Sequence, residues 1–139
     1  MTAFDSDILT LIWEGVDPYA SWAALIPSPD RGIPIVVAEE VLRGRLDQIR
    51  KASAGKVKVS LPGAYDLLQF SLTALRGGVY LPFTDRAEQL IASWRAARFR
   101  VKVMDMRIAA TAMASGATLV TRNAGDFTLI PGLSLDVWT

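Results

Sequence analysis

The sequence contains no cysteine and no histidine. Without cysteine there is no disulfide framework, no thiol nucleophile and no zinc–thiolate site. Without histidine there is no Ser-His-Asp triad and no imidazole general base. Any catalytic chemistry must therefore rely on carboxylates, hydroxyl groups, lysine or arginine.

Long hydrophobic runs are also missing. The longest apolar runs fall short of the ~20 residues that a membrane-spanning helix requires. The N-terminus, Met-Thr-Ala-Phe-Asp, has no basic region followed by an apolar one. We therefore expect a soluble, cytoplasmic protein without membrane contacts. The 139 residues, 51% of them hydrophobic, are enough for a single domain over residues 1–139 with its own core.

The formal net charge is only +1, which does not by itself indicate a nucleic-acid partner. Basic residues nevertheless gather in two stretches. One runs from Arg43 to Lys58, where Asp47 is the single acid, and the other runs from Arg95 to Arg107. Solvated helix flanks are the simpler interpretation, and an RNA-binding surface is the alternative.

Short apolar segments typical of strands alternate with segments of helical spacing. The predicted strands are residues 2–4, 33–37, 79–81, 117–121 and, at a sheet edge, 133–138. The predicted helices are residues 8–15, 18–26, 38–49, 62–75, 85–97 and 105–114, with Asp17 and Thr84 as N-caps. This alternation predicts an α/β fold in which helices cover both faces of a mostly parallel sheet of four to five strands.

Acidic residues recur where the predicted strands end. Asp5 and the pair Glu39 and Glu40 lie at strand-to-helix junctions, Asp126 lies just beyond a strand, and Asp105 opens a buried helix. In a parallel sheet these junctions gather at one edge, where ligands bind in open α/β folds. Each acid also has a structural interpretation as a helix cap, a first-turn residue or a turn residue.

Several carboxylates at one edge repel one another and lose hydration, and a divalent cation removes that cost. Ligation by oxygen alone points to Mg²⁺, with Mn²⁺ as the alternative. The chemistry expected of such a site is phosphodiester hydrolysis, in which the metal activates a water and stabilises the leaving oxygen.

Four segments carry a resemblance that covers almost the whole chain. They are Asp5-Ser-Asp-Ile-Leu, Glu40-Val-Leu-Arg-Gly, Asp105-Met-Arg-Ile-Ala-Ala, and Leu119-Val-Thr-Arg-Asn-Ala-Gly-Asp-Phe followed by Pro131-Gly-Leu. Together they resemble the PIN-domain family, specifically the VapC-type toxin ribonucleases. The resemblance implies a three-layer α/β/α sandwich, Mg²⁺-dependent endoribonuclease activity on RNA, a small cognate antitoxin as partner, and a homodimer.

Matched by position to the family, Asp5 and Asp105 are the acids assigned to the metal, and Glu40 is a further acid because a glycine follows four residues later. The helical wheel instead favours Glu39, which flanks the apolar stripe, so this choice stays open. Family members often have Asp at the position of Asn123, but many relatives have the Asn-x-x-Asp form that this sequence shows. We therefore interpret Asp126 as the fourth acid and Asn123 as a contact to substrate or metal-bound water.

Other polar residues are candidates for positioning substrate or water. Ser6 and Thr121 offer hydroxyl groups, although each is also suited to capping a turn. Arg122 and the basic stretches are candidates for holding the RNA backbone. The antitoxin is expected to lie in an apolar groove that the aromatic residues Tyr19, Trp22 and Tyr65 line.

Two alternatives follow from the same residues. Asp5-Ser6-Asp7 after a strand is similar to the Asp-x-Asp of haloacid-dehalogenase-type phosphohydrolases, but the lysine and the later acidic pair of that family are not convincing here. A phospho-acceptor receiver domain would need a lysine where this chain has Arg122. The other alternative is a PIN fold that binds RNA or protein without cleaving it.

Overall fold

The computed structural model describes all residues from Met1 to Thr139. Its centre is one five-stranded sheet in the order β3-β2-β1-β4-β5, and every neighbouring pair of strands is parallel. The strands are β1 (Thr2–Phe4), β2 (Arg31–Pro34), β3 (Val79–Leu81), β4 (Thr118–Thr121) and β5 (Leu135–Val137). The predicted parallel sheet is confirmed, with β3 and β5 at its edges.

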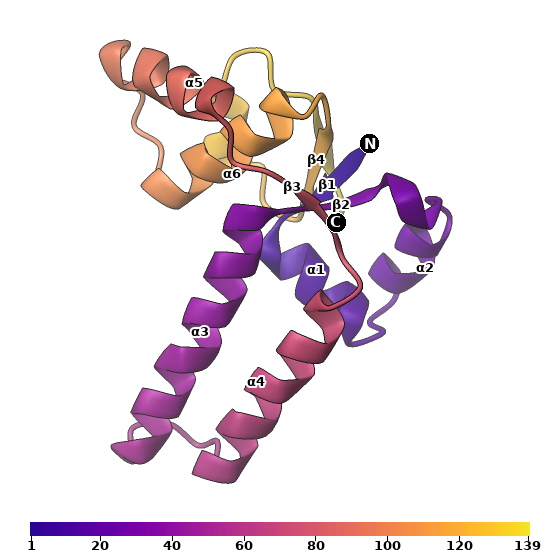
Figure 1. Cartoon of the computed structure of the whole chain (residues 1–139), viewed down its shortest axis with the longest axis vertical. Helices are drawn as coiled ribbons and strands as arrows, with labels where there is room; N and C mark the ends of the chain where they lie inside the picture. The colour runs from indigo at the N-terminus through magenta and orange to yellow at the C-terminus, as the bar shows by residue number, and fades with distance from the viewer.

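Six α-helices cover the sheet (Figure 1). They are α1 (Ser6–Trp13), α2 (Tyr19–Ala24), α3 (Ile35–Ser53), α4 (Leu61–Leu75), α5 (Asp85–Ala96) and α6 (Val103–Ala114). Two short 3₁₀ helices, η1 (Ser28–Asp30) and η2 (Gly125–Leu129), complete the chain. Helices α1 to α4 lie on one side of the sheet and α5 and α6 on the other, as right-handed crossovers between strands in this order require.

The core is formed where β1 and β4 are covered on both faces. Leu119 and Val120 of β4 are buried, and so are Ala109, Ala110 and Ala112 of α6. Small side chains on α6 allow a close approach to the sheet, and the apolar run of β4 is typical of a strand with no solvent-facing side. None of the six α-helices combines the length and the hydropathy that a membrane-spanning helix needs.

The predicted extent of the second strand was wrong. Residues 33–37 were expected to be extended, but β2 ends at Pro34 and α3 begins at Ile35. Val36 and Val37 are buried as helical residues. The helix propensity that a β-branched residue gives up is well under 1 kcal/mol, which burial against the core exceeds. Glu39 and Glu40 therefore lie in the second turn of α3 and not at a strand-to-helix junction.

Most other boundaries agree within two residues. The exceptions are the end of α3, which was expected at residue 49 and lies at Ser53, and two helix starts. Asp105 was expected to open its helix, but α6 begins at Val103 and its N-cap position is Lys102. Asp17 was expected to cap its helix, but Pro18 occupies the N-cap position of α2 and Asp17 accepts a hydrogen bond from the Ser21 backbone N–H (3.1 Å). Thr84 caps α5 as predicted.

Helices α3 and α4 run side by side and extend away from the sheet as a two-helix arm (Figure 1). Arg45 of α3 crosses to α4, where its Nε donates to the buried Ser71 hydroxyl (2.9 Å). The Ser71 side chain has no solvent contact, so this bond fixes the Arg45 side chain relative to both helices.

Candidate active site

A polar cavity of about 370 Å³ opens at the carboxyl edge of the sheet. It lies where β1 and β4, two neighbouring parallel strands, end. Its lining residues are Asp5, Lys102, Asp105, Thr121, Asn123, Gly125, Asp126 and Phe127. Three of the four acids carried over from the family, which lie far apart in the sequence, thus share one cavity.

Asp5 is fixed by the backbone around it. It follows β1 directly, its backbone N–H donates to the Val120 carbonyl (3.2 Å), and its Oδ1 accepts from the Ile8 N–H (2.9 Å) as the N-cap of α1. Burial is the main cause that raises the pKa of the Asp5 carboxyl, with hydrogen bonds from Thr121 and Ile8 acting in the opposite direction. The structural and functional interpretations of Asp5 are therefore compatible, because one oxygen caps the helix while the group faces the cavity.

Asp105 lies in the first turn of α6, where the helix dipole favours a negative charge. Burial nevertheless raises the pKa of its carboxyl, and the charges of Glu40 and Asp126 raise it further. Lys102 lowers it. From the sequence, Lys102 was only one residue of a basic stretch. Its position three residues before Asp105, one helical turn away, could have indicated that the two side chains lie near each other.

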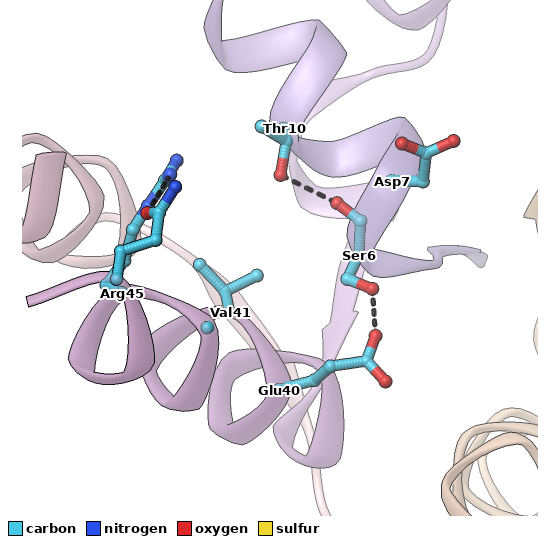
Figure 2. A pocket seen from close by; sticks show the side chains of 8 residues that line it. Ser6, Asp7, Thr10, Glu40, Val41 and Arg45 are labelled. Carbon is cyan, nitrogen blue, oxygen red and sulfur yellow. Dashed lines mark hydrogen bonds between the residues drawn. The ribbon is translucent and has the colours of Figure 1, made fainter. Parts of the chain in front are cut away.

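Glu40 adjoins this cavity from α3. Its side chain accepts a hydrogen bond from the Ser6 hydroxyl (Figure 2), and its charge raises the pKa values of both Asp5 and Asp105. Glu39 is exposed and forms an ion pair with Arg43 on the surface of α3. The structure thus brings Glu40, and not Glu39, toward the other acids.

The helical wheel favoured Glu39 because the strand boundary was misplaced. Val36 and Val37 precede Glu40 by four and three residues, so once they count as helical they put Glu40 on the buried face of α3. Glu39 then falls on the opposite, solvent-facing side. An error of a few residues at the start of the helix was enough to reverse the choice.

The turn after β4 brings the remaining polar groups to the cavity. Thr121 is buried, and its Oγ1 accepts from the Asn123 backbone N–H (3.2 Å). Gly125 has φ +28°, and a Cβ there would lie 3.1 Å from the Asn123 amide oxygen, so the tight turn needs glycine. Asp126 follows in the first turn of η2 and lines the cavity with Asn123.

Arg122 does not line this cavity. Its guanidinium lies 5.4 Å from the centre of the Tyr19 ring and 3.5 Å from the Asp7 carboxylate. Asp7 is exposed and lines a second cavity, which lies between α1 and α3, whereas Asp5 lines the cavity at the sheet edge. Because the two acids of Asp5-Ser6-Asp7 face different spaces, the geometry disfavours the Asp-x-Asp phosphohydrolase.

The cavity acids have no cationic partner within ion-pair distance, since every salt bridge in the protein involves other acids. The donors available to a cation are carboxylate, amide and hydroxyl oxygens. No three acidic side chains lie close enough together to hold a metal ion by themselves. A hard cation that keeps most of its waters and takes one or two carboxylates fits this donor set.

The model of the PIN domain family matches residues 4–132. The chain belongs to the PIN domain family. This confirms the PIN-like α/β/α architecture expected from the sequence. Among curated proteins no match was found.

Several solved structures share the fold of this PIN domain. VapBC2 from Rickettsia felis, bound to a DNA fragment from its promoter, is 22% identical with a TM-score of 0.71 over 99% of this chain and 98% of that chain. A toxin-antitoxin complex from Klebsiella pneumoniae is 23% identical with a TM-score of 0.68, covering 96% and 95%. DNA-bound VapBC from Salmonella typhimurium is 18% identical with a TM-score of 0.71 over the full length of both chains.

Proposed function

We propose that this PIN domain is a Mg²⁺-dependent endoribonuclease that acts as the toxin of a toxin-antitoxin pair. The observation that carries the proposal is the cavity at the carboxyl edge of the sheet, where Asp5, Asp105 and Asp126 gather without forming an ion pair and Lys102 is the one cation in the lining. Gathering partly buried carboxylates costs free energy in the isolated chain, and such an arrangement is typical of a cation-binding site.

Asp5 and Asp105 are the residues that would hold Mg²⁺, or Mn²⁺ in its place, directly or through water. Burial raises the pKa values of both carboxyls, so a nearby positive charge would stabilise their ionised forms. The bound cation would supply a water of lowered pKa for attack on phosphorus and charge stabilisation at the leaving oxygen.

The other cavity residues position water and substrate in this proposal. Glu40 and Asp126 would orient the attacking water and accept its proton. Thr121 holds the turn through the Asn123 N–H, which leaves the Asn123 side chain to contact a phosphate or a water. Ser6 orients Glu40 through their hydrogen bond.

Arg122 is an exposed cation at the same edge of the sheet, suited to contacting the RNA backbone. Its contacts with Asp7 and Tyr19 hold the guanidinium in place. In the basic stretch from Arg43 to Lys58, Arg43, Arg50 and Lys51 are less suited, because they form closer ion pairs within α3 than Arg122 forms with Asp7.

The partner proposal rests on the toxin-antitoxin complexes among the structural neighbours. Of the aromatic residues suggested by the sequence, Tyr19 is buried in the core, whereas Trp22 is 38% and Tyr65 55% exposed. We assign Trp22 and Tyr65 to the antitoxin-facing surface and leave Tyr19 as a packing residue. A homodimer is proposed on the family resemblance alone.

The test is an RNA cleavage assay with the purified chain. Single-stranded RNA incubated with protein and Mg²⁺ is expected to be cut, and EDTA is expected to stop the reaction. Mn²⁺ soaked into a crystal is expected to give an anomalous signal beside Asp5 and Asp105. A protein that binds RNA equally with Mg²⁺ or EDTA but never cuts it would favour the non-catalytic alternative.

A further inference from the structure

A second polar cavity of about 370 Å³ lies between α1 and α3 (Figure 2). It is lined by Ser6, Asp7, Thr10, Glu40, Val41, Gly44, Arg45 and Gln48, of which only Val41 is hydrophobic. Its size is within the ~300–1,000 Å³ typical of small-ligand sites, and its lining indicates a polar occupant. None of the roles proposed above involves the end of this cavity at Arg45 and Gln48.

This cavity adjoins the candidate active site. Ser6 follows Asp5 directly in the chain, and Glu40 lines this cavity while its charge acts on both Asp5 and Asp105. A group bound here would therefore lie beside the candidate active site. The inference drawn from this position rests on the proposed nuclease function.

The end of the cavity at Arg45 is rich in hydrogen-bond donors. The Arg45 Nε donates to Ser71 (2.9 Å) and Nη1 to the Gln48 Oε1 (3.2 Å). These two bonds use two of the five N–H groups of the guanidinium, and they leave the Gln48 NH₂ group as a further donor. Because Ser71 is fully buried, the guanidinium fork is held in place before any ligand arrives.

The end at Ser6 is rich in acceptors. Thr10 donates its hydroxyl to the Ser6 carbonyl (2.8 Å), and Ser6 donates to Glu40 (Figure 2), so both hydroxyl protons are already used. The carboxylates of Glu40 and Asp7 each have a second oxygen that can accept a hydrogen bond, since one Glu40 oxygen accepts from Ser6 and one Asp7 oxygen lies 3.5 Å from Arg122. Both groups carry negative charge. They disfavour a phosphate in this cavity, while Arg45 disfavours a cationic side chain of a protein partner.

A guanine base presents the complementary pattern. Its O6 and N7 atoms are acceptors that suit an arginine fork, and its N1–H and N2–H₂ groups are donors that suit a carboxylate. We propose that the cavity between α1 and α3 binds a guanine base of single-stranded RNA next to the phosphodiester that is cut. The cavity thereby selects the sequence at which the enzyme acts.

Gly44 offers a test that leaves the polar groups untouched. A Cβ at Gly44 would meet nothing within 4 Å, so a side chain there projects into open space on the cavity wall. Gly44→Leu fills the cavity, and because leucine is a better helix former than glycine the helix is expected to fold at least as well. Gly44→Ala is the matched control, since a single methyl group leaves most of the space.

The experiment measures binding in EDTA, where the RNA is not cut, by fluorescence anisotropy. The probes are uridine 10-mers with one central guanosine, adenosine or inosine. Wild type and Gly44→Ala are expected to prefer the guanosine over the adenosine RNA by about 5- to 150-fold, with inosine between them. Gly44→Leu and Arg45→Lys are expected to reduce this ratio to about one, within the error of the assay.

Equal affinity of the wild type for the guanosine and adenosine RNAs would overturn the proposal, and so would a guanosine preference that survives Gly44→Leu. Release of a co-expressed antitoxin by Gly44→Leu, with no base preference in the wild type, would assign the cavity to a protein partner instead. Failure of the nuclease proposal is distinct, because it appears as absent cleavage in Mg²⁺ whatever the base preference.

Discussion

Acids on the surface of α3 and acids in the cavity at the sheet edge occupy opposite electrostatic environments. Asp47 is placed between Lys51 and Arg50, whose hydrogen bonds lower the pKa of its carboxyl. Asp5 and Asp105 have no ion-pair partner, and burial raises their pKa values. The acids on α3 thus form ion pairs with cations one helical turn away, whereas the cavity acids form none, and Lys102 acts on Asp105 only through its charge.

The difference indicates which acids are the better candidates for function. An i,i+3 or i,i+4 ion pair needs only a helix, and it contributes little to stability. The cavity acids follow β1, lie in the first turn of α6 and follow β4, with Glu40 of α3 beside them, and bringing them together costs desolvation and mutual repulsion. A stable fold would be expected to avoid that cost unless a ligand offsets it, so the cavity acids are the better candidates for function.

The largest expected effect distinguishes these two groups of acids directly. Asp105→Asn is expected to reduce Mg²⁺-dependent RNA cleavage by at least about 100-fold, since a metal site supplies several kcal/mol of transition-state stabilisation. Asp47→Asn, an identical change on the surface of α3, is expected to leave the rate unchanged. Initial rates on one fluorescent RNA, with circular dichroism to verify folding, measure both. Equal rates for the two variants would remove the distinction.

Adjacent residues of α3 provide a sharper version of the comparison. Glu40→Gln is expected to slow cleavage by about 10- to 100-fold, because Glu40 orients water beside the metal without being one of its assigned ligands. Glu39→Gln breaks only the exposed pair with Arg43 and is expected to change the rate by less than about twofold. A larger loss in Glu39→Gln would restore the choice that the helical wheel favoured.

The next smaller effect on cleavage is expected from Asp126 and Asn123 in the turn after β4. Asp126 acts on the pKa of Asp105 through its charge, whereas Asn123 is neutral and exposed. Asp126→Asn is therefore expected to reduce cleavage about 10-fold or more, and Asn123→Ala by less than that. Rates at saturating and at limiting RNA separate a role in catalysis from a role in binding. The opposite ranking would make Asn123 the fourth functional group.

Much of the fold could be predicted from local sequence patterns. The apolar runs of β1, β3 and β4 and the cap at Thr84 are local signals, and the alternation of strands and helices fixes a parallel sheet. The boundary between β2 and α3 could not be predicted, because Val36 and Val37 favour strands locally and their helical state is decided by burial against the core.

The acidic cavity was predictable in outline because parallel strands place their carboxyl ends together. The cavity between α1 and α3 was not, since it depends on how two helices are spaced. Arg45 belonged to an apparently solvated basic stretch, and only the packing of α4 brings the buried Ser71 to its guanidinium. No periodicity in the sequence contains that information.

The smallest expected effect concerns the pH dependence of stability in EDTA. The folded-state pKa of Asp5 is raised, so the native protein holds more protons than the unfolded chain at pH values above the ordinary 3.8. The free energy of unfolding should therefore fall as the pH rises through the folded-state pKa. Asp5→Asn keeps an acceptor for the helix cap but cannot ionise. Its stability relative to wild type, measured by urea unfolding, should increase with pH.

Asp47→Asn should show the reverse slope. The pKa of Asp47 is lowered, so its contribution is present above the ordinary value of 3.8 and is lost as the pH falls through the folded-state pKa. Relative to wild type, Asp47→Asn should thus lose stability as the pH rises. Mg²⁺ at neutral pH should stabilise the wild type but not Asp5→Asn, because binding to the native state alone adds to its stability. If the stabilities of Asp5→Asn and Asp47→Asn relative to wild type changed with pH in the same direction, the cavity and the surface of α3 would not differ in their effect on carboxyl pKa values.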